Sequence, residues 1–471
     1  MRSFSPPSPK KLLPYALLAG LGLLAPGGAR PLPTTGPRPT RLTVADRSRL
    51  GQRFWPAADS LDELKIVYLG SSVPYGQGAT NKYGYPSRYA TLLARRYAAG
   101  LGAAWTTANA SVPGDNTVKV AARWRRDLLP QRGRYVVLAL SLGNEGIHGG
   151  GQVVFEQFAR NLRALVERAR AAGRVPVVTN CYGRGDFTPA DYAYVRRLNL
   201  LLHTWDVPSV NLLGAVDDGQ GRWATGYWDD GYHPNDRGHA ELAHALVPSL
   251  FDALRAGKKS PQRQTTSYCR LGAAGGLLFA PEALVHSFAQ VVDFRAAGPG
   301  RLLTLQDSTG TGSLHLDAGG ALAYASALGG RLGGPHAADG RWHRVVLTHY
   351  FARGETLLYL DGTLVGHLPE QLRTQRLSLG GAGAARGGQY RNWLFYRAGM
   401  NADEVRALAA DSLLQSSLEL YAPLDGRHRA PADSLANLAQ STNRLVSWRV
   451  AGPARPVLTP AARPRPAQPR H

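Results

Sequence analysis

Cysteine, methionine and lysine are scarce in this 471-residue sequence. It holds two cysteines and two methionines, and lysine accounts for only seven of the 55 basic residues. Neither Cys181 nor Cys269 stands in a metal-ligand pattern, so the sequence gives no sign of a metal centre built on cysteine. A disulfide between the two is compatible with export, but the sequence leaves their pairing open.

Long apolar runs are also missing after the N-terminus. The first eleven residues carry three basic side chains, followed by an apolar stretch over 12–24 and small residues at 27–29. This order is typical of a secretory signal peptide, which we place at 1–29. The apolar stretch is too short to span a bilayer comfortably, and no cysteine near its end indicates a lipid anchor. We therefore expect a soluble exported protein, either secreted or located in the periplasm or at the cell surface, without a transmembrane segment.

Acidic residues are outnumbered, 33 against 55 basic ones, which gives a formal net charge of +22. Such a charge fits an anionic partner such as nucleic acid, an acidic polysaccharide or a membrane surface. Between residues 60 and 450, however, the arginines are scattered among alanine, glycine and proline without a dense block. We interpret them as a composition bias of a solvated surface and expect no nucleic-acid partner.

Short apolar runs alternate with amphipathic stretches between residues 60 and 256. The apolar runs, which we predict to be strands, are 66–69, 106–112, 135–141, 175–181 and 209–213. The amphipathic stretches, which we predict to be helices, are 88–97, 117–128, 154–171, 192–203 and 236–254. This alternation favours right-handed crossovers and a parallel sheet covered on both faces. We therefore predict a three-layer α/β/α sandwich, in a chain long enough to bury at least two cores.

After a break at 257–264 the pattern changes to glycine-rich turns and alternating strands. The Asp-Gly pair at 361–362, between two apolar runs, predicts a β-hairpin. Such spacing predicts an all-β sandwich of the jelly-roll type over 265–450. The proline-rich segment 30–59 is predicted to be a linker, and 451–471, where proline and arginine alternate, a disordered tail.

Four motifs of the α/β region carry polar side chains in loops that can meet. They are GSSVPYG at 70–76, SVPGDN at 111–116, LGNE at 142–145 and DGYH at 230–233. Loops at the carboxyl ends of parallel strands converge on one crevice. A serine hydroxyl is a poor nucleophile until a base takes its proton, and His233 is the candidate base for Ser72. Asp230 can hold the other ring nitrogen, which fixes the tautomer, so the sequence predicts a Ser72, His233 and Asp230 triad.

The same loops can supply donors for an oxyanion. Attack on an ester carbonyl creates a negatively charged oxygen that needs fixed hydrogen-bond donors. The backbone N–H groups of Ser72 and Gly114 and the side-chain amide of Asn144 provide three. Glycine at 114 also lets a substrate approach the backbone closely. We expect no cofactor for this chemistry.

Each motif alone has a simpler explanation. A serine in a glycine-rich turn is usually a turn residue, an Asp-x-x-His is more often a helix cap or surface pair, and Asn144 could satisfy loop backbone. A metal site on Asp229, His233 and His239 is an alternative use of the last loop, but it lacks the tight histidine spacing that metals impose. The catalytic interpretation is favoured because all four motifs occur in loops at strand ends and in the expected order.

In type and order the motifs resemble the four sequence blocks of the SGNH (GDSL-type) hydrolase family. The resemblance covers about residues 60–256 and implies a flavodoxin-like sheet. Position by position it implies Ser72 as nucleophile, His233 as base, Asp230 as its orienter, and Ser72, Gly114 and Asn144 as oxyanion donors. Two departures stand out. Ser71 occupies a position where the family commonly has aspartate, and the third block reads LGNE instead of Gly-x-Asn-Asp.

The second half resembles a laminin G-like, concanavalin A-type sandwich. The resemblance rests on GRWHRV at 340–345, YLDG at 359–362 and WLFYRA at 393–398. It implies a carbohydrate- or protein-binding module that targets the enzyme. The alternative is that Trp342, Trp393 and Tyr359 are core aromatics and the domain only supports its neighbour. No acidic loop cluster argues for calcium.

Together these features predict an exported serine ester hydrolase that works through an acyl-enzyme and is held near a polymer by the sandwich. Acetyl groups on polysaccharide are the expected target, because the sequence has no long apolar lid and its predicted crevice loops are rich in aromatic residues. These aromatics, suited to sugar stacking, are Tyr75, Tyr85, Tyr182, Tyr227 and Trp228. A short-chain lipid esterase or lysophospholipase would use the same triad, and a non-catalytic surface glycan-binding protein is the alternative from another class.

Overall fold

The computed structural model describes residues 60–263, 268–273, 275–424, 434–449 and 458–459. The signal peptide predicted at 1–29 and the linker predicted at 30–59 lie outside these residues. Of the tail predicted at 451–471, only Leu458 and Thr459 are described, and they form a short strand, β23, which pairs with strand β8, Tyr268–Arg270. No helix in the described part of the chain has the length and apolar character needed to cross a membrane.

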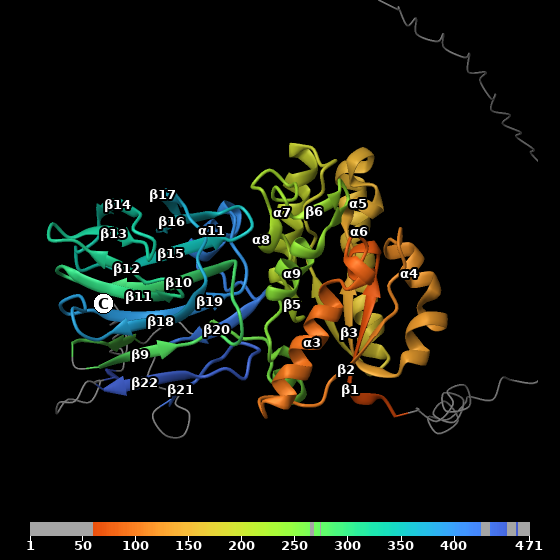
Figure 1. The fold of residues 1–471 in the computed structure, drawn as a ribbon, viewed down its shortest axis with the longest axis horizontal. Coiled ribbons are helices and arrows are strands. Elements are labelled where there is room, and N and C mark those ends of the chain that lie inside the picture. The colour runs from red at the N-terminus through yellow and green to blue at the C-terminus, as the bar shows by residue number, and fades with distance from the viewer. Residues whose placement is uncertain (1–59, 264–267, 274, 425–433, 450–457, 460–471) are drawn as a thin grey trace, which may run out of the picture. The chain divides into compact units, whose positions relative to one another are not determined.

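The α/β domain is built on a five-stranded parallel sheet of order β2-β1-β3-β4-β5. Figure 1 shows this domain in red to green, with helices around the sheet. The strands are β1 Asp62–Gly70, β2 Thr106–Asn109, β3 Gly133–Ala139, β4 Val175–Thr179 and β5 Ser209–Val210. The predicted parallel sheet is confirmed. Several strands end before the predicted apolar runs do, because the runs continue as buried loops at the carboxyl ends, as at Cys181.

Helices cover both faces of this sheet, as the predicted three-layer sandwich requires. The main helices are α3 Tyr85–Ala98, α4 Thr117–Arg123, α6 Ile147–Ala171, α7 Pro189–His203, α9 Asp236–His244 and α10 Leu250–Arg255. In β1, Val67 and Leu69 pack with residues of α4, α6 and α7, whereas Ile66 and Tyr68 pack with α3, α9 and α10. Successive residues of one strand thus enter two separate cores, because strand side chains alternate between faces.

Two of the predicted helices are interrupted in the structure. The closing helix expected over 236–254 is two helices, since α9 ends at His244 and α10 begins at Leu250. Pro248 lies between them, and proline interrupts a helix because it lacks the backbone N–H. Similarly, the helix expected over 117–128 is regular only to Arg123 and continues as a π-helical turn over Trp124–Leu128.

The second half forms two eight-stranded antiparallel sheets, which confirms the predicted sandwich. The first has the order β17-β16-β15-β10-β19-β8-β23, with β20 paired to β19, and the second β14-β13-β12-β11-β18-β9-β22-β21. The first sheet contains β8 Tyr268–Arg270, β10 Phe288–Arg295, β15 His343–Tyr350, β16 Glu355–Leu360, β17 Thr363–Pro369, β19 Gln389–Tyr396, β20 Leu418–Ala422 and β23 Leu458–Thr459. The second contains β9 Gly275–Phe279, β11 Gly300–Asp307, β12 Thr311–Leu316, β13 Ala321–Ala325, β14 Arg331–His336, β18 Thr374–Gly380, β21 Ser434–Leu435 and β22 Leu445–Arg449. Inward side chains of both sheets make one core.

The hairpin predicted at 361–362 is confirmed between β16 and β17. Asp361 and Gly362 both have positive φ angles, 51° and 83°, as a two-residue hairpin turn requires. Outside the first sheet lies a helix, α11 Ala402–Ala409, whose Val405 and Leu408 pack on the outward side chains of β10 and β19.

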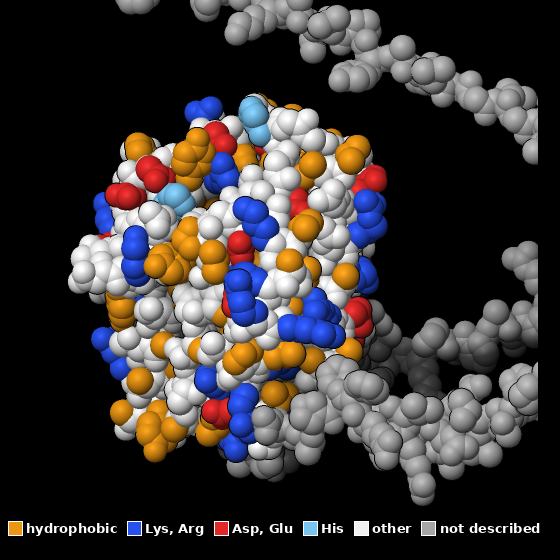
Figure 2. All heavy atoms as spheres, turned by 90° about the vertical axis from the view of Figure 1, so that its right-hand side faces the viewer, with side chains coloured by type: hydrophobic (Ala, Val, Ile, Leu, Met, Phe, Trp, Pro, Cys, Tyr) orange, Lys and Arg blue, Asp and Glu red, His pale blue; other side chains and the backbone are white. Residues whose placement is uncertain are grey.

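On one face of the α/β domain, basic side chains are spread over the surface rather than gathered into one block (Figure 2). Figure 2 shows them on one face among uncharged and apolar side chains, with acidic groups between them. This distribution agrees with a solvated arginine-rich surface.

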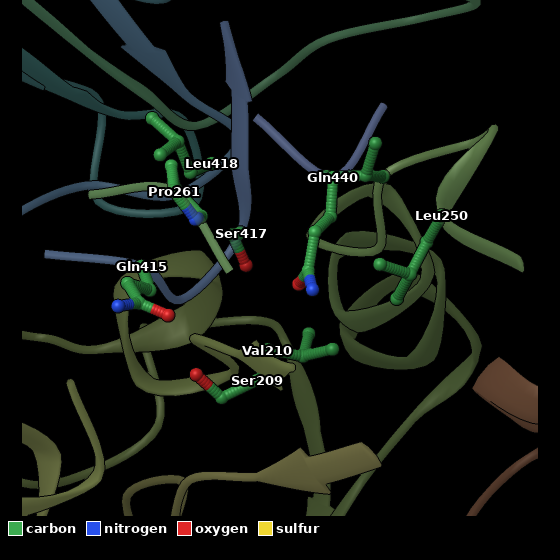
Figure 3. Close-up of a pocket in the computed structure, with 9 residues that line it drawn as sticks. Ser209, Val210, Leu250, Pro261, Gln415, Ser417, Leu418 and Gln440 are labelled. Atoms are coloured by element: carbon green, nitrogen blue, oxygen red, sulfur yellow. The ribbon is translucent and has the colours of Figure 1, made fainter. Parts of the chain in front are cut away.

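One edge strand of the parallel sheet, β5, is covered by the sandwich. The backbone N–H of Ser417 donates to the carbonyl oxygen of Ser209 at 3.0 Å, and the N–H of Asn211 donates to Oγ of Ser417 at 2.8 Å. The hydroxyls of Ser209 and Ser416 lie 2.7 Å apart. Beside this contact Ser417 and Gln440 point into a small pocket (Figure 3). An edge strand covered in this way cannot pair with another chain.

A buried arginine of the sandwich joins the two domains. Arg397, 1% exposed, donates through Nε to the carbonyl of His244 in the last turn of α9 at 2.8 Å. Its Nη1 pairs with the buried carboxylate of Glu419 at 2.8 Å, and its other donors reach the carbonyls of Glu282 and Leu284. The segment predicted as an interdomain linker is also held, because Nζ of Lys258 donates to two carbonyl oxygens of the sandwich at 2.6 Å each.

Replacing Arg397 is expected to destabilise the whole protein. Arg397→Ala leaves the Glu419 charge buried without its partner, which costs about 3–5 kcal/mol. Urea unfolding followed by tryptophan fluorescence measures this loss. Arg341→Ala, at an exposed arginine, is the control and should change the free energy of unfolding by less than about 0.5 kcal/mol. An equal free energy of unfolding for the two variants would show that the buried Arg397 contacts do not stabilise the protein.

Candidate active site

Ser72 begins a short helix directly after the first strand. Strand β1 ends at Gly70, and α2 spans Ser72–Tyr75. A Cβ atom at Gly70 would lie 2.1 Å from the carbonyl oxygen of Ala139 on β3, so only glycine lets the turn pack this closely. Because Ser72 is in the first helical turn, its backbone N–H has no partner within the helix and remains available to a ligand.

The oxyanion candidates lie in the loops after the next two strands of the sheet. Gly114 stands between β2 and α4 with a φ of 77°, in the left-handed region that favours glycine. Asn144 belongs to the short helix α5, Leu142–Glu145, which follows β3. Its Nδ2 donates one hydrogen bond, at 3.0 Å, to the carbonyl of Asp115, and leaves its second hydrogen for another acceptor.

Asp230 and His233 belong to a two-stranded ribbon formed by β6 Trp228–Asp230 and β7 His233–Pro234. Nδ1 of His233 lies 2.9 and 2.8 Å from the two carboxylate oxygens of Asp230. A carboxylate only accepts, so Nδ1 carries the hydrogen and Nε2 keeps its lone pair. Burial works to raise the pKa of Asp230, but hydrogen bonds from the His233 ring and two backbone N–H groups outweigh it, and the pKa lies below its ordinary value.

The structure brings four of the five predicted site residues to one pocket. Ser72, Gly114, Asn144 and His233 line it, and Asp230 bonds to the pocket histidine. The remaining walls are formed by Gln77, Pro113, Tyr182, Arg184 and Tyr232. Within residues 60–263 no hydrogen bond joins the Ser72 hydroxyl to the His233 ring, as is common before a substrate tightens such a site.

A buried arginine fixes the two loops that carry Ser72 and Gly114. Arg123 donates to the carbonyl of Gly70, the last residue of β1, at 3.2 Å and to that of Ala110, just after β2, at 2.6 Å. It also forms a buried ion pair with Asp115, next to Gly114. Sequence analysis missed this residue, although its position between Val120 and Trp124 on the apolar face of a predicted helix was a signal.

The metal alternative is wrong, because His239 has no free ring nitrogen. Its Nδ1 accepts from the backbone N–H of Tyr85 at 3.2 Å, and its Nε2 donates to the carbonyl of Gln77 at 2.9 Å. Within the described ranges no group of three or more His, Cys, Asp or Glu residues could hold a metal ion. Cys181 and Cys269, whose pairing the sequence left open, form no disulfide, and both are buried.

Three of the five aromatics expected in the crevice are buried, namely Tyr85, Tyr182 and Tyr227. Of these three, Tyr182 lines the pocket. Tyr75 and Trp228 are 39% and 48% exposed. Tyr232 also lines the pocket and is 49% exposed, a residue that sequence analysis missed although it lies inside the DGYH motif.

Comparison with known proteins decides the family of the α/β domain. Residues 68–241 match the GDSL-like Lipase/Acylhydrolase family. The domain belongs to that family. This match makes the α/β domain a carboxylic ester hydrolase domain and confirms the resemblance to the family. No curated protein matches the chain.

Several solved structures are similar at low identity. An acetyl xylan esterase variant from Geobacillus stearothermophilus is 18% identical, with 42% of this chain and 97% of that chain covered and a TM-score of 0.33. A Desulfitobacterium hafniense protein assigned to the G-D-S-L lipolytic family is 13% identical, with 39% and 97% covered and a TM-score of 0.32. A Bacteroides ovatus protein assigned as carbohydrate binding is 13% identical, with a TM-score of 0.33; 43% of this chain and 63% of that chain are covered.

The GDSL-like domain has a physical reason for the glutamate of its third motif. Glu145 accepts a hydrogen bond from the backbone N–H of Thr117 at 2.9 Å and another from the Thr117 hydroxyl. Thr117 is the first residue of α4, where a negative charge is favourable. Glu145 thus links the loop of Asn144 to the helix that follows the Gly114 loop.

Acid is expected to weaken the GDSL-like domain through His239. Burial lowers the pKa of His239 to about 4, while an unfolded histidine has a pKa of about 6.5. Between these values the unfolded chain binds a proton that the folded chain does not, so stability falls as pH drops from 6.5 to 4. His239→Gln removes this pH-dependent part of the free energy of unfolding. The variant is less stable than wild type at pH 7, and the difference in free energy of unfolding between the two should shrink by about 3 kcal/mol from pH 7 to pH 4.

Urea unfolding at half-unit pH steps measures the effect of His239→Gln. The exposed His336→Gln variant is the control and should keep the wild-type pH dependence. A deficit of His239→Gln that stays constant with pH would contradict the buried neutral histidine.

Proposed function

We propose that the protein is an exported carbohydrate O-acetyl esterase that uses Ser72 as its nucleophile. The observation that carries this proposal is the common pocket of Ser72, Gly114, Asn144 and His233, with Asp230 bonded to Nδ1 of His233. A hydroxyl, an imidazole with a free Nε2 and a carboxylate on its other nitrogen are what serine acyl transfer requires.

In the first half-reaction, Oγ of Ser72 attacks the ester carbonyl carbon while Nε2 of His233 takes the hydroxyl proton. The carbonyl oxygen becomes an oxyanion, which accepts hydrogen bonds from the N–H groups of Ser72 and Gly114 and from the free hydrogen of Asn144. The bond to the alcohol oxygen then breaks, and His233 returns the proton to that oxygen. The products are the free alcohol and an acyl group on Ser72.

In the second half-reaction, water replaces the alcohol. His233 takes a proton from the water, whose oxygen attacks the acyl carbon and regenerates the same oxyanion. Collapse releases the carboxylic acid, and His233 returns its proton to Oγ of Ser72. Asp230 stays ionised throughout, in keeping with its lowered pKa, and stabilises the imidazolium in both halves.

A small acyl group on a sugar fits this pocket better than a long chain does. Its walls are largely polar or aromatic, including Gln77, Arg184 and Tyr232. Two exposed aromatic rings lie close in sequence to the catalytic residues. Tyr75 comes three residues after Ser72, and Trp228 two residues before Asp230, so both rings can stack on sugar rings. Binding of a glycan or protein by a laminin G-like sandwich, and export by the N-terminal segment, complete the proposal.

Ser72→Ala is expected to abolish hydrolysis of p-nitrophenyl acetate. The neighbouring Ser71→Ala makes the same change of size one residue earlier and should keep activity within about tenfold of wild type. Initial rates at equal concentrations of folded protein compare the two. Equal activity in Ser72→Ala and wild type would assign the reaction to another nucleophile, and absence of activity in all three would favour a non-catalytic binding protein.

The rate should fall steeply as the acyl chain of the substrate lengthens. We expect kcat/KM for p-nitrophenyl octanoate to lie at least about tenfold below that for the acetate, since polar side chains such as Gln77, Asn144 and Arg184 interrupt the apolar surface that a long chain would bury. The alcohol part of the substrate is tested by comparing acetate release from acetylated xylan with fatty-acid release from lysophospholipid. Preference for octanoate and lysophospholipid would assign the protein to the lipid esterases instead.

A further inference from the structure

Arg184, in the loop after β4, forms one wall of the pocket and contacts Asn144. Its Nη1 donates to Oδ1 of Asn144 at 3.3 Å. Its Nε and Nη2 donate to the two carboxylate oxygens of Asp186 at 2.9 and 2.8 Å, which fixes the plane of the guanidinium. The guanidinium also lies over the ring of Tyr232, 4.7 Å from its centre. With its side chain only 13% exposed, Arg184 is held on three sides.

These contacts allow the amide of Asn144 only one orientation. Nδ2 donates to the carbonyl of Asp115, which cannot donate, and Oδ1 accepts from Arg184, which cannot accept. A flipped amide would place oxygen against oxygen at Asp115 and N–H against N–H at Arg184. The second hydrogen on Nδ2 therefore keeps one direction, and this is the hydrogen that the proposed reaction needs for the oxyanion.

The glycine before Asn144 makes room for Arg184. A Cβ atom at position 143 would lie 2.3 Å from Nη1 and 2.7 Å from Cδ of Arg184. The glycine of the LGNE motif thus stands where the arginine crosses the loop. This contact gives a physical reason for the position of the glycine in this chain, independent of the hydrogen bond to Asn144.

The backbone around Arg184 is attached to the loop of the candidate base. The N–H of Gly185 donates to the carbonyl of Gly231 at 2.7 Å, between Asp230 and His233. The N–H of Arg184 itself donates to the carbonyl of Gly221 at 2.9 Å. The segment that carries Arg184 therefore connects Asn144 with the loop of Asp230 and His233, and backbone hydrogen bonds hold it to Gly221 and Gly231.

We propose that Arg184 is a positioning residue that orients the Asn144 amide toward the oxyanion. The proposal rests on the proposed function, because it assigns the arginine a part in the same reaction. Arg184 acts through Asn144 and does not itself touch the reacting atoms. Its loss frees the amide to rotate, which weakens the stabilisation of the transition state more than the binding of the substrate.

A double-mutant cycle on p-nitrophenyl acetate tests this coupling. Asn144→Ala is expected to lower kcat by about 10²-fold or more. Arg184→Ala is expected to lower kcat by about tenfold or more with little change in KM, and the double variant should be no slower than Asn144→Ala alone. Losses that multiply in the double variant would overturn the proposal, since they would show that Arg184 acts without Asn144.

A second cycle combines Gly143→Ala with Arg184→Ala and leaves the Asn144 side chain in place. Gly143→Ala should lower kcat in the wild-type background by displacing the guanidinium. In the Arg184→Ala background the space is free, so the same substitution should cost much less. An equal loss in both backgrounds would overturn the proposed clash.

Three further variants complete the experiment. Arg184→Lys keeps the charge but cannot contact Asp186 and Asn144 together, so it should resemble Arg184→Ala; full activity would overturn the need for the planar fork. Arg197→Ala removes an arginine that stacks on Phe155 away from the pocket, and it should retain wild-type kcat. Ser72→Ala in the same assay separates the two proposals. Persistence of its activity overturns the proposed function, whereas Ser72-dependent rates with multiplying losses overturn the role of Arg184 alone.

Discussion

The buried guanidinium of Arg123 is the constraint on which the site geometry depends. It donates hydrogen bonds to the carbonyl at the end of β1 and to a carbonyl just after β2, and it forms an ion pair with Asp115. The backbone carbonyl of Asp115 in turn accepts a hydrogen bond from Asn144. Three of the four motif loops are thereby connected through one cation and its partner. Since a buried ion pair is costly to break on one side only, these loops cannot shift independently.

The fold and the meeting of the four motifs could be predicted because both follow from local patterns and one topological rule. Alternating apolar runs and helices predict a parallel sheet, and such a sheet brings the loops at its strand ends together. The break between α9 and α10 was also readable at Pro248. The family match then assigns the reaction class, which agrees with serine, histidine and asparagine sharing one pocket.

What could not be predicted depends on neighbours that are distant in sequence. The sequence alone does not show that Arg184 reaches Asn144, or that Tyr85 packs edge-on against Tyr68 in the core while Tyr232 stays at the pocket. The sandwich is similar: its strands were predictable from alternation, but the bonds of Ser417 to β5 and of Arg397 to α9 join residues more than 150 positions apart. A single sequence records such partners only as isolated polar residues in apolar surroundings.

The cover over β5 has a consequence for how a polymer can be handled. A binding module on a flexible tether lets its enzyme search many positions along a bound chain. Here Ser417 and Arg397 fasten the sandwich to the sheet edge and to the helix that follows His233. If the sandwich binds a polysaccharide, as proposed, the bound polymer would therefore present its ester groups to the pocket at one fixed distance.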